Sequence, residues 1–449
     1  MLFSSNVFLF VFLPSVLLIY YISPRRLRNP VLLLFSLFFY GWGEPVYLFL
    51  MIGDILLNYV CGRWIIFQRE KGRSGRIALI TGVVLNLLLL GYFKYAGFLF
   101  GGLVPEIPLP IGISFYIFQS MSYIIDVYRN DAPMQKNVLT FGTYVTLFPQ
   151  LIAGPIVRYA DVAQMLQTRR ENLSQFASGV LMFIVGLSKK VLLANPMGNL
   201  WNLLQAEEGT LTAWVGLLAY TLQIYFDFSG YSDMAIGLGR MFGFEFLENF
   251  NYPYISASIT EFWRRWHISL STWFKEYVYI PLGGNRRGVR RQIVNIMIVW
   301  LLTGLWHGAS WNFVLWGGYY ALLLIIEKVF LLKWLKKVPK VFGHFYAMLA
   351  VMLGWALFYF EDLSALGCFL IRLFSPTSSA GAMALICGYL PLMLIALLAA
   401  TPLLKNVVAK QESTAFIRYG KLAAAAAAML LCVAALASQS YNPFIYFRF

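Results

Sequence analysis

The stretch Leu301-Leu-Thr-Gly-Leu-Trp-His-Gly-Ala-Ser-Trp-Asn-Phe-Val-Leu-Trp316 carries one imidazole, that of His307, beside the turn of an apolar hairpin. Apolar spans at 293–307 and 312–332 form this hairpin, with one basic cluster before the first span and another after the second. The pattern predicts two membrane helices joined by a short turn. Because a charged side chain at mid-membrane depth costs about 2–3 kcal/mol, His307 is a candidate functional residue.

The same apolar character extends over the whole chain. Of its 449 residues, 60% are hydrophobic and only 12% are charged, which excludes a soluble globular domain and indicates a polytopic membrane protein. We therefore predict an all-α fold in a single domain over residues 1–449, because no linker or internal repeat divides the chain. Several spans are shorter than the roughly 20 residues of a full crossing, so we expect tilted, re-entrant or buried helices among them. The spans lie at 7–22, 30–40, 46–62, 77–97, 110–127, 138–153, 175–194, 213–238, 293–307, 312–332, 343–360, 383–400 and 421–439.

Basic residues predict how the chain is oriented. No basic residue precedes the first span, whereas Arg25, Arg26 and Arg28 directly follow it, which opposes a cleaved signal peptide. The formal net charge of +15 is an orientation signal rather than a sign of nucleic-acid binding, because the basic residues are scattered between spans. The positive-inside rule places both termini outside and predicts cytoplasmic segments at 64–76, 285–291, 333–340 and 405–421.

The neighbours of His307 favour a functional site. Gly304 allows a close backbone approach, Trp306 and Trp311 can wall a cavity, and Asn312 offers a hydrogen-bond partner. The alternative interpretation is a buried histidine that is bonded to a helix carbonyl.

The stretch from Ser258 to Ile280 predicts one amphipathic helix at the membrane interface. Its start, Ser258-Ile-Thr-Glu261, matches a capping box, and large apolar side chains recur at helical spacing until Pro281. Arg264 and Arg265 lie mainly on the opposite face.

Two interpretations of this helix remain open. It is either a positively charged surface anchor in which His267 is a hydrogen-bonded packing residue, or the wall of a site. In the second case Trp263, His267 and Ser271, at i, i+4 spacing, form one polar seam that faces the protein.

A third polar cluster lies in or beside the span at 213–238. It includes Gln223, Asp227 and Asp233, and carboxylates in such a span must be paired, protonated or hydrated. They either bond a neighbouring helix for structural reasons or orient an active-site residue.

The common enzyme signatures are absent. The chain has no G-x-S-x-G elbow, no P-loop and no HExxH motif. Its three histidines and four cysteines show no metal-ligand spacing, so we predict no metal site.

Several long motifs resemble the membrane-bound O-acyltransferase family, and the similarity extends over essentially the whole chain. Its branch of alginate and peptidoglycan O-acetyltransferase membrane subunits is the most similar, with the D-alanyl transfer subunit of teichoic acid modification as a relative. The motifs are Leu109-Pro-Ile-Gly-Ile-Ser-Phe-Tyr-Ile-Phe-Gln119, Phe148-Pro-Gln-Leu-Ile-Ala-Gly-Pro-Ile-Val-Arg158, the segment 223–243, Glu261-Phe-Trp-Arg-Arg-Trp-His-Ile-Ser-Leu-Ser271, Gly304-Leu-Trp-His-Gly-Ala-Ser-Trp311 and Asn442-Pro-Phe-Ile-Tyr-Phe-Arg-Phe449.

The resemblance implies a fold of roughly 11–13 membrane helices with an outer funnel and horizontal helices near the cytoplasmic face. It implies that His307 is the catalytic histidine and His267 a second, inner histidine. Neutral His307 would remove the acceptor proton, with Asn312 or a backbone N–H stabilising the oxyanion, while Trp263 and Ser271 would line the donor path. An acyl-histidine intermediate is the less favoured variant.

The resemblance also implies the reactants and the location. The acyl donor would be cytoplasmic acetyl-CoA or an acyl carrier protein, and no cofactor would be permanently bound. The acceptor would be a polysaccharide outside a bacterial cytoplasmic membrane, reached through an exported SGNH-type acetyltransferase partner of the kind that acts in alginate acetylation.

Two alternatives remain. One is an acyltransferase of the same family that acts on a lipid or transfers D-alanine. The other is a secondary transporter in which Asp227 and Asp233 couple protons, although the inverted repeats typical of that class are not found.

Overall fold

A computed structural model describes the chain except residues 105–106, 153, 376–379, 404, 407–414, 439–444 and 446–449. The described residues form helices and turns without a β-strand, as the all-α prediction requires. Seven of these helices are long and apolar enough to cross a membrane, so the protein is a multi-pass membrane protein. Ile445 is described, but the rest of the closing motif at 442–449 lies outside the described residues, as does much of the basic segment at 405–421.

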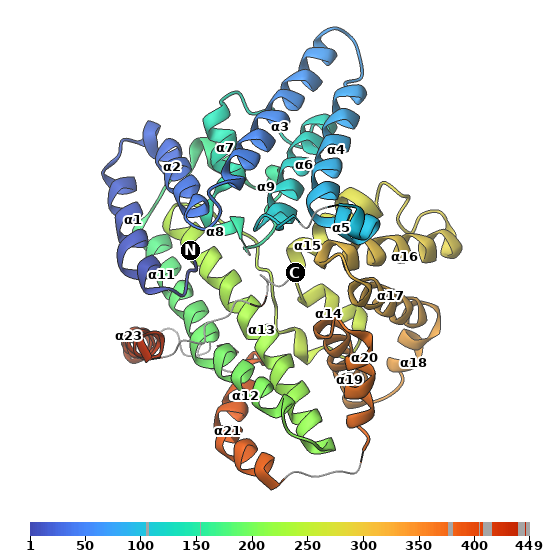
Figure 1. Ribbon diagram of the computed structural model, residues 1–449. Coiled ribbons are helices and arrows are strands. Elements are labelled where there is room, and N and C mark those ends of the chain that lie inside the picture. The colour runs from blue at the N-terminus through green and yellow to red at the C-terminus, as the bar shows by residue number, and fades with distance from the viewer. Residues whose placement is uncertain are drawn as a thin grey trace. The chain divides into compact units, whose positions relative to one another are not determined.

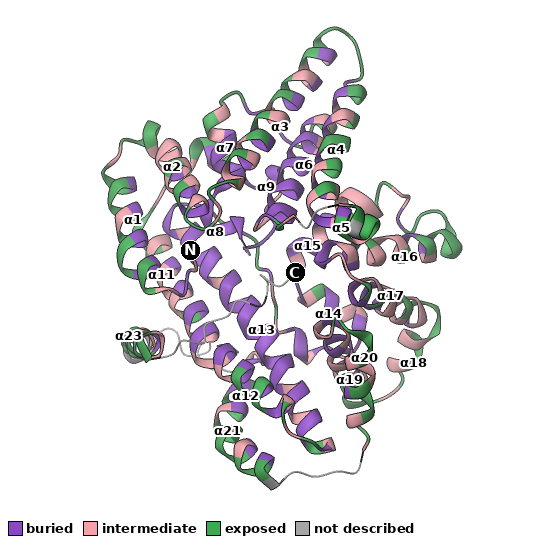
Figure 2. Cartoon of the chain, viewed as in Figure 1, coloured by how far each residue is buried: buried purple, intermediate pink, exposed green. Residues whose placement is uncertain are grey.

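Contacts divide the chain into two compact units. Unit 1 comprises Met1–Phe183 and Tyr231–Leu247, and unit 2 comprises Ile184–Gly230 and Glu248–Phe449. Two of the boundaries fall inside helices, one of them in α13 (Thr210–Met241), which explains why no linker marks them in the sequence. Helix α13 is buried along nearly its whole length (Figure 2).

In unit 1, three helices that hold buried polar side chains pack side by side (Figure 1). Asp54 on α3 (Tyr47–Glu70) accepts hydrogen bonds from Asn58 at 2.8 Å and from Ser120 at 2.6 Å, and Asn58 accepts one from Asn86 at 2.8 Å. These bonds satisfy polar groups that would be costly to bury alone. The three helices are α3, α4 (Arg76–Leu90) and α6 (Ile113–Arg129). The other helices that lie within unit 1 are α1 (Leu13–Ile22), α2 (Arg28–Gly41), α5 (Ala96–Phe100), α7 (Val138–Thr146), α8 (Phe148–Leu151), α9 (Tyr159–Val162) and α10 (Met165–Thr168), and α11 (Leu173–Ser188) begins there.

In unit 2, the hairpin of α16 (Gly288–His307) and α17 (Trp311–Ile326) packs against α19 (Lys340–Tyr359) (Figure 1). The two hairpin helices cross at Gly304 and Gly317, where a methyl group would overlap the carbonyl oxygens of Phe313 and Trp300 respectively. The further helices are α12 (Asn195–Gln205), α14 (Ile259–Arg265), α15 (Ile268–Phe274), α18 (Leu332–Leu335), α20 (Leu363–Arg372), α21 (Ala380–Ala399) and α23 (Ala415–Ser438).

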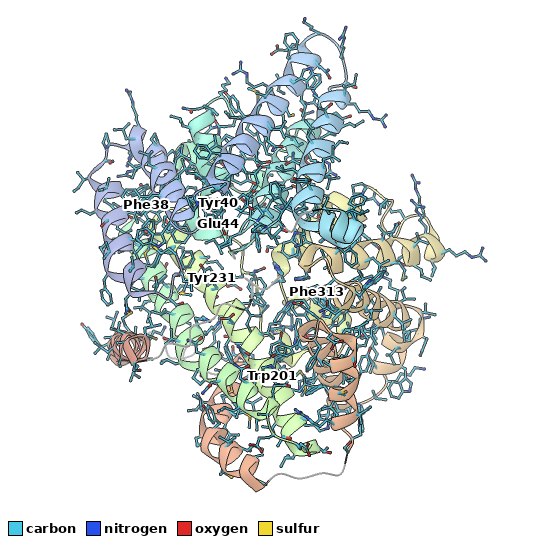
Figure 3. All side chains as sticks on the ribbon, in the orientation of Figure 1. Phe38, Tyr40, Glu44, Trp201, Tyr231 and Phe313 are labelled. Atoms are coloured by element: carbon cyan, nitrogen blue, oxygen red, sulfur yellow. The ribbon has the colours of Figure 1, made fainter. Side chains whose placement is uncertain are left out.

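The core of unit 2 is aromatic. Trp201 packs its ring against Tyr220 and Tyr359, with ring centroids 5.4 and 4.9 Å apart, and Phe313 packs against Phe358 at 5.0 Å. Trp201 and Phe313 are labelled in Figure 3. Phe358, a member of this core, packs against the imidazole of His307.

Candidate functional site

The segment around His267 is broken, which corrects the prediction of one continuous helix from Ser258 to Ile280. Helix α14 ends at Arg265, and α15 begins at Ile268. Between them His267 adopts left-handed backbone angles, with φ of 46° and ψ of 53°. A residue other than glycine rarely takes this conformation, and it is often found at functional sites.

The physical reason for the break is a neighbouring segment that takes over the backbone hydrogen bonds of a continuous helix. Asn249 O accepts from Ile268 N at 3.0 Å, and Asn251 N donates to Arg265 O at 2.9 Å. Asn249 Oδ1 also accepts from Ser269 N at 3.1 Å. Neither glycine nor proline occurs at the break, so local sequence gave no sign of it. Half of the predicted capping box forms, because Ser258 Oγ accepts from Glu261 N at 3.0 Å, whereas the Glu261 carboxylate accepts from Ala257 N at 3.0 Å rather than from the N-cap backbone N–H.

Asn249 also determines the tautomer of His267. Because Asn249 Oδ1 accepts from the backbone N–H of Ser269, the His267 Nδ1 that lies 3.2 Å from this oxygen must be the protonated nitrogen. Nε2 is then the nitrogen with a lone pair. Burial lowers the pKa of His267 to about 3, so the ring is neutral near pH 7 and is a weak base.

His267 lines a cavity of about 230 Å³ in unit 2. Trp263 and Ser271 line the same cavity, so the break keeps the three residues of the predicted seam together although it removes their i, i+4 register. Arg264 and Lys275 add two cationic groups. The remaining lining residues are Thr260, Leu270, Phe274, Tyr279, Val299, Trp300, Thr303 and Leu324.

His307 is the last residue of α16 and is 7% exposed. The rings of Trp316 and Phe358 pack edge-on against its imidazole at 5.1 and 5.2 Å. It lines a second cavity of about 20 Å³, large enough for about one water molecule. Asp227 and Ile445 line this cavity as well.

Trp306 contacts both histidines. Its ring centroid lies 6.0 Å from that of His267 and 5.1 Å from that of His307. The two imidazoles line separate cavities, and the same indole, that of Trp306, lies beside both imidazoles.

A buried ion pair adjoins His307. Lys190 Nζ lies 2.5 Å from Asp227 Oδ1, each side chain is 2% exposed, and Asp227 Oδ2 accepts from Ile445 N at 2.8 Å. The sequence predicted that Asp227 must be paired, protonated or hydrated; the structure shows it paired with Lys190, which the prediction did not name. The sequence did contain a signal for Lys190, because an ionisable residue inside an apolar span requires a partner and Lys190 lies in the span at 175–194.

Glu327 is another functional candidate that the sequence did not indicate. It is fully buried and accepts hydrogen bonds from Ile259 N at 2.6 Å, Thr260 N at 2.8 Å and Thr260 Oγ1 at 2.6 Å. These donors form the first turn of α14, so the end of α17 anchors the helix that leads to His267.

Some predicted site residues line neither cavity. Asn312 is fully buried, donates to Phe358 O at 3.2 Å and accepts from Ser310. Trp311 is 64% exposed at the start of α17. Arg265 pairs with Glu261 at 2.9 Å.

Two of the three polar residues predicted on α13 also line neither cavity. Gln223 packs its amide against Gly198, and Asp233 is half-buried in the part of α13 that belongs to unit 1. Asp227 is therefore the one member of that trio which lines a cavity with a histidine.

Comparison with known proteins gives consistent matches. Residues 129–369 match the model of the MBOAT, membrane-bound O-acyltransferase family. The chain is 47% identical to a probable alginate O-acetylase AlgI of Azotobacter vinelandii, over 81% of this chain and 76% of the relative. A protein of the same name from Pseudomonas putida is 41% identical over the full length of both chains. A peptidoglycan O-acetyltransferase of Helicobacter pylori is 34% identical over 81% of this chain and 78% of its own length.

Proposed function

The chain belongs to the membrane-bound O-acyltransferase family and is an acyltransferase, and we propose that it moves acetyl groups from cytoplasmic acetyl-CoA to hydroxyls of an extracytoplasmic polysaccharide. The names of the relatives support acetyl as the acyl group and a polysaccharide as the acceptor. The observation that carries the proposal is the position of Trp306 beside two buried histidines that line separate cavities.

The cavity beside His267 suits the donor. A thioester on a pantetheine arm needs a narrow path lined by apolar and hydroxyl groups, which Trp263 and Ser271 supply. Arg264 and Lys275 would meet phosphate groups of the nucleotide, or of an acyl carrier protein that presents the same arm. His267 has too low a pKa to be an effective general base, so we assign it a positioning role through Nε2.

The cavity beside His307 suits the reacting hydroxyl. His307 takes the proton of the acceptor hydroxyl as its oxygen attacks the thioester carbonyl carbon, a contribution of about 10²–10⁴ in rate. The C–S bond then breaks, and the proton passes from the imidazole to the thiolate of CoA. Asp227 and Lys190 hold the wall next to His307 rather than exchange protons in transport.

The test is acetyl-CoA turnover by the purified full chain with any exported partner. His307→Ala and His307→Gln should each abolish it and leave folding intact, whereas His344→Ala, at an exposed histidine, should retain wild-type turnover. Wild-type turnover by folded His307→Ala would refute the assignment. A wild-type protein that never consumes acetyl-CoA but carries a solute down a gradient would be a transporter.

The proposal also requires an orientation. We place both termini outside a bacterial cytoplasmic membrane, with an SGNH-type partner on that face and residues 64–76 in the cytoplasm. Single cysteines at positions 5 and 74 should be labelled from opposite faces after the exposed Cys368 and Cys387 are replaced by serine. Labelling of both from one face would contradict the two-sided site.

A further inference from the structure

Unit 1 contains a strongly cationic cavity that the acyl transfer does not use. Its volume is about 540 Å³, and five arginines but only one carboxylate line it. The arginines come from two segments far apart in sequence, one at the start of α2 and the other between α10 and α11. The charged lining residues are Arg25, Arg26, Arg28, Arg169, Arg170 and Glu171.

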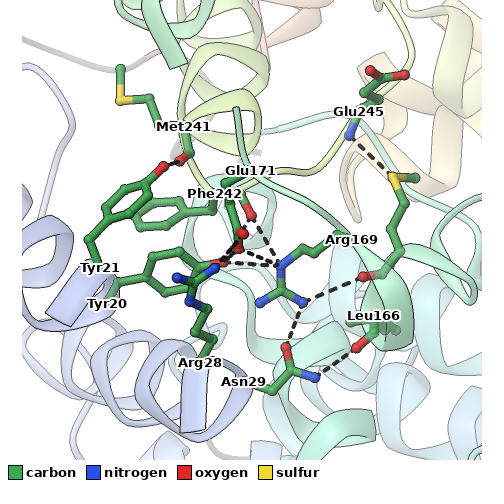
Figure 4. A network of polar contacts seen from close by, with 11 residues as sticks. Tyr20, Tyr21, Arg28, Asn29, Leu166, Arg169, Glu171, Met241, Phe242 and Glu245 are labelled. Carbon is green, nitrogen blue, oxygen red and sulfur yellow. Dashed lines mark hydrogen bonds and ion pairs between the residues drawn. The ribbon is translucent and has the colours of Figure 1, made fainter. Parts of the chain in front are cut away.

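The inner part of this arginine cavity is held in place by hydrogen bonds (Figure 4). Glu171 accepts from Tyr20 and from Arg28, which keep its pKa low although burial acts to raise it. Arg169 donates to Asn29 Oδ1 at 2.7 Å and to Phe242 O at 3.1 Å. The single carboxylate is thus already engaged, and the two inner guanidinium groups are fixed.

Among the residues that the structure describes, two guanidinium nitrogens in the inner part of the arginine cavity lack a hydrogen-bond acceptor. Within the described part of the chain, Arg169 Nη2 and Arg28 Nε are buried and have no hydrogen-bond acceptor. Buried donors of charged groups are rarely left unsatisfied in a folded protein. The outer arginines, Arg25, Arg26 and Arg170, are exposed, so an anion can enter.

Exposed apolar side chains flank the same arginines in the sequence. Ile22 is 76% exposed, Leu27 is 52% exposed and Leu173 is 84% exposed. A soluble phosphate compound makes no use of such side chains, whereas a phospholipid brings an anionic headgroup and acyl chains together.

We propose that the arginine cavity binds the phosphate headgroup of an anionic phospholipid. The phosphate oxygens accept from Arg28 and Arg169, whose guanidinium groups match their geometry. Arg25, Arg26 and Arg170 surround the headgroup, and the acyl chains lie along Ile22, Leu27 and Leu173.

Native mass spectrometry of the purified full chain tests this with phosphatidylglycerol as the probe and phosphatidylcholine as the neutral lipid. The double variant Arg25→Gln/Arg26→Gln alters only exposed side chains, and it should bind phosphatidylglycerol at least about tenfold more weakly than wild type. The matched control Arg286→Gln/Arg290→Gln removes the same charge from exposed positions in unit 2 and should change the affinity less than twofold.

Soluble phosphates distinguish the source of the anion. Neither inorganic phosphate nor adenosine 3′,5′-bisphosphate should displace the lipid at comparable concentration. Binding of either soluble compound in its place would refute the phospholipid. Equal losses in the two double variants would mean diffuse attraction rather than a site, and unchanged binding in both would also overturn the proposal.

Discussion

Glu327→Ala should be among the most damaging single changes in unit 2, although Glu327 lines neither cavity. Its carboxylate accepts three hydrogen bonds from the first turn of α14, at 2.6, 2.8 and 2.6 Å. Hydrogen bonds to a charged group contribute about 1.5–3 kcal/mol each, and the desolvation of the carboxylate offsets several kcal/mol of their sum. We therefore expect the free energy of unfolding to fall by about 3–5 kcal/mol. Because α14 ends two residues before His267, turnover should fall as well.

Graded variants can separate this anchor from a general loss of stability. Glu327→Gln keeps one carbonyl oxygen, so its loss should be about 1–3 kcal/mol, and Glu361→Ala at an exposed carboxylate should cost almost nothing. Thr260→Val removes only the hydroxyl donor. A double-mutant cycle of Glu327→Gln and Thr260→Val, followed by unfolding in detergent, should give a coupling energy of at least about 0.5 kcal/mol. Additive effects, or a Glu327→Ala protein within about 1 kcal/mol of wild type, would refute the anchor.

Three further predictions concern the site itself. Gly304→Ala should reduce turnover at least about tenfold and stability by about 1–3 kcal/mol, because the methyl group overlaps Phe313 O, whereas Gly318→Ala, in open space on α17, should be tolerated. Ser271→Trp should raise the KM for acetyl-CoA with little change for the acceptor, and Thr272→Trp, whose side chain does not line the cavity, should not; an acceptor-only defect would place the donor path elsewhere. Burial lowers the pKa of His267 to about 3, so between pH 6.5 and about 3 the unfolded chain binds a proton at this ring and the folded chain does not, and the free energy of unfolding decreases as pH falls through this window. Between pH 6.5 and 5, His267→Asn should lose less free energy of unfolding than wild type, by up to about 2 kcal/mol in unfolding experiments. Identical pH slopes in the two proteins would contradict the buried neutral ring.

The class of the fold was determined by the sequence alone. Apolar spans separated by basic clusters leave the backbone no alternative to helices in a membrane, because every N–H and C=O must be satisfied within its own segment. The same logic singled out His307 and Asp227, since ionisable groups are rare in such spans and need partners. Helical periodicity also found the start of α14, where Ser258 caps the first turn as predicted.

Tertiary structure decided how the parts of the site are arranged. The predicted continuous helix through Trp266 and His267 is wrong, because Asn249 and Asn251, from another segment, take over its backbone hydrogen bonds. Trp263, His267 and Ser271 nevertheless line one cavity, as the predicted seam required. Lys190 and Glu327 join the site for the same reason, since their partners come from other helices. Local pattern determines which residues must be buried, whereas long-range pairing determines which of them meet, and no sequence period encodes that pairing.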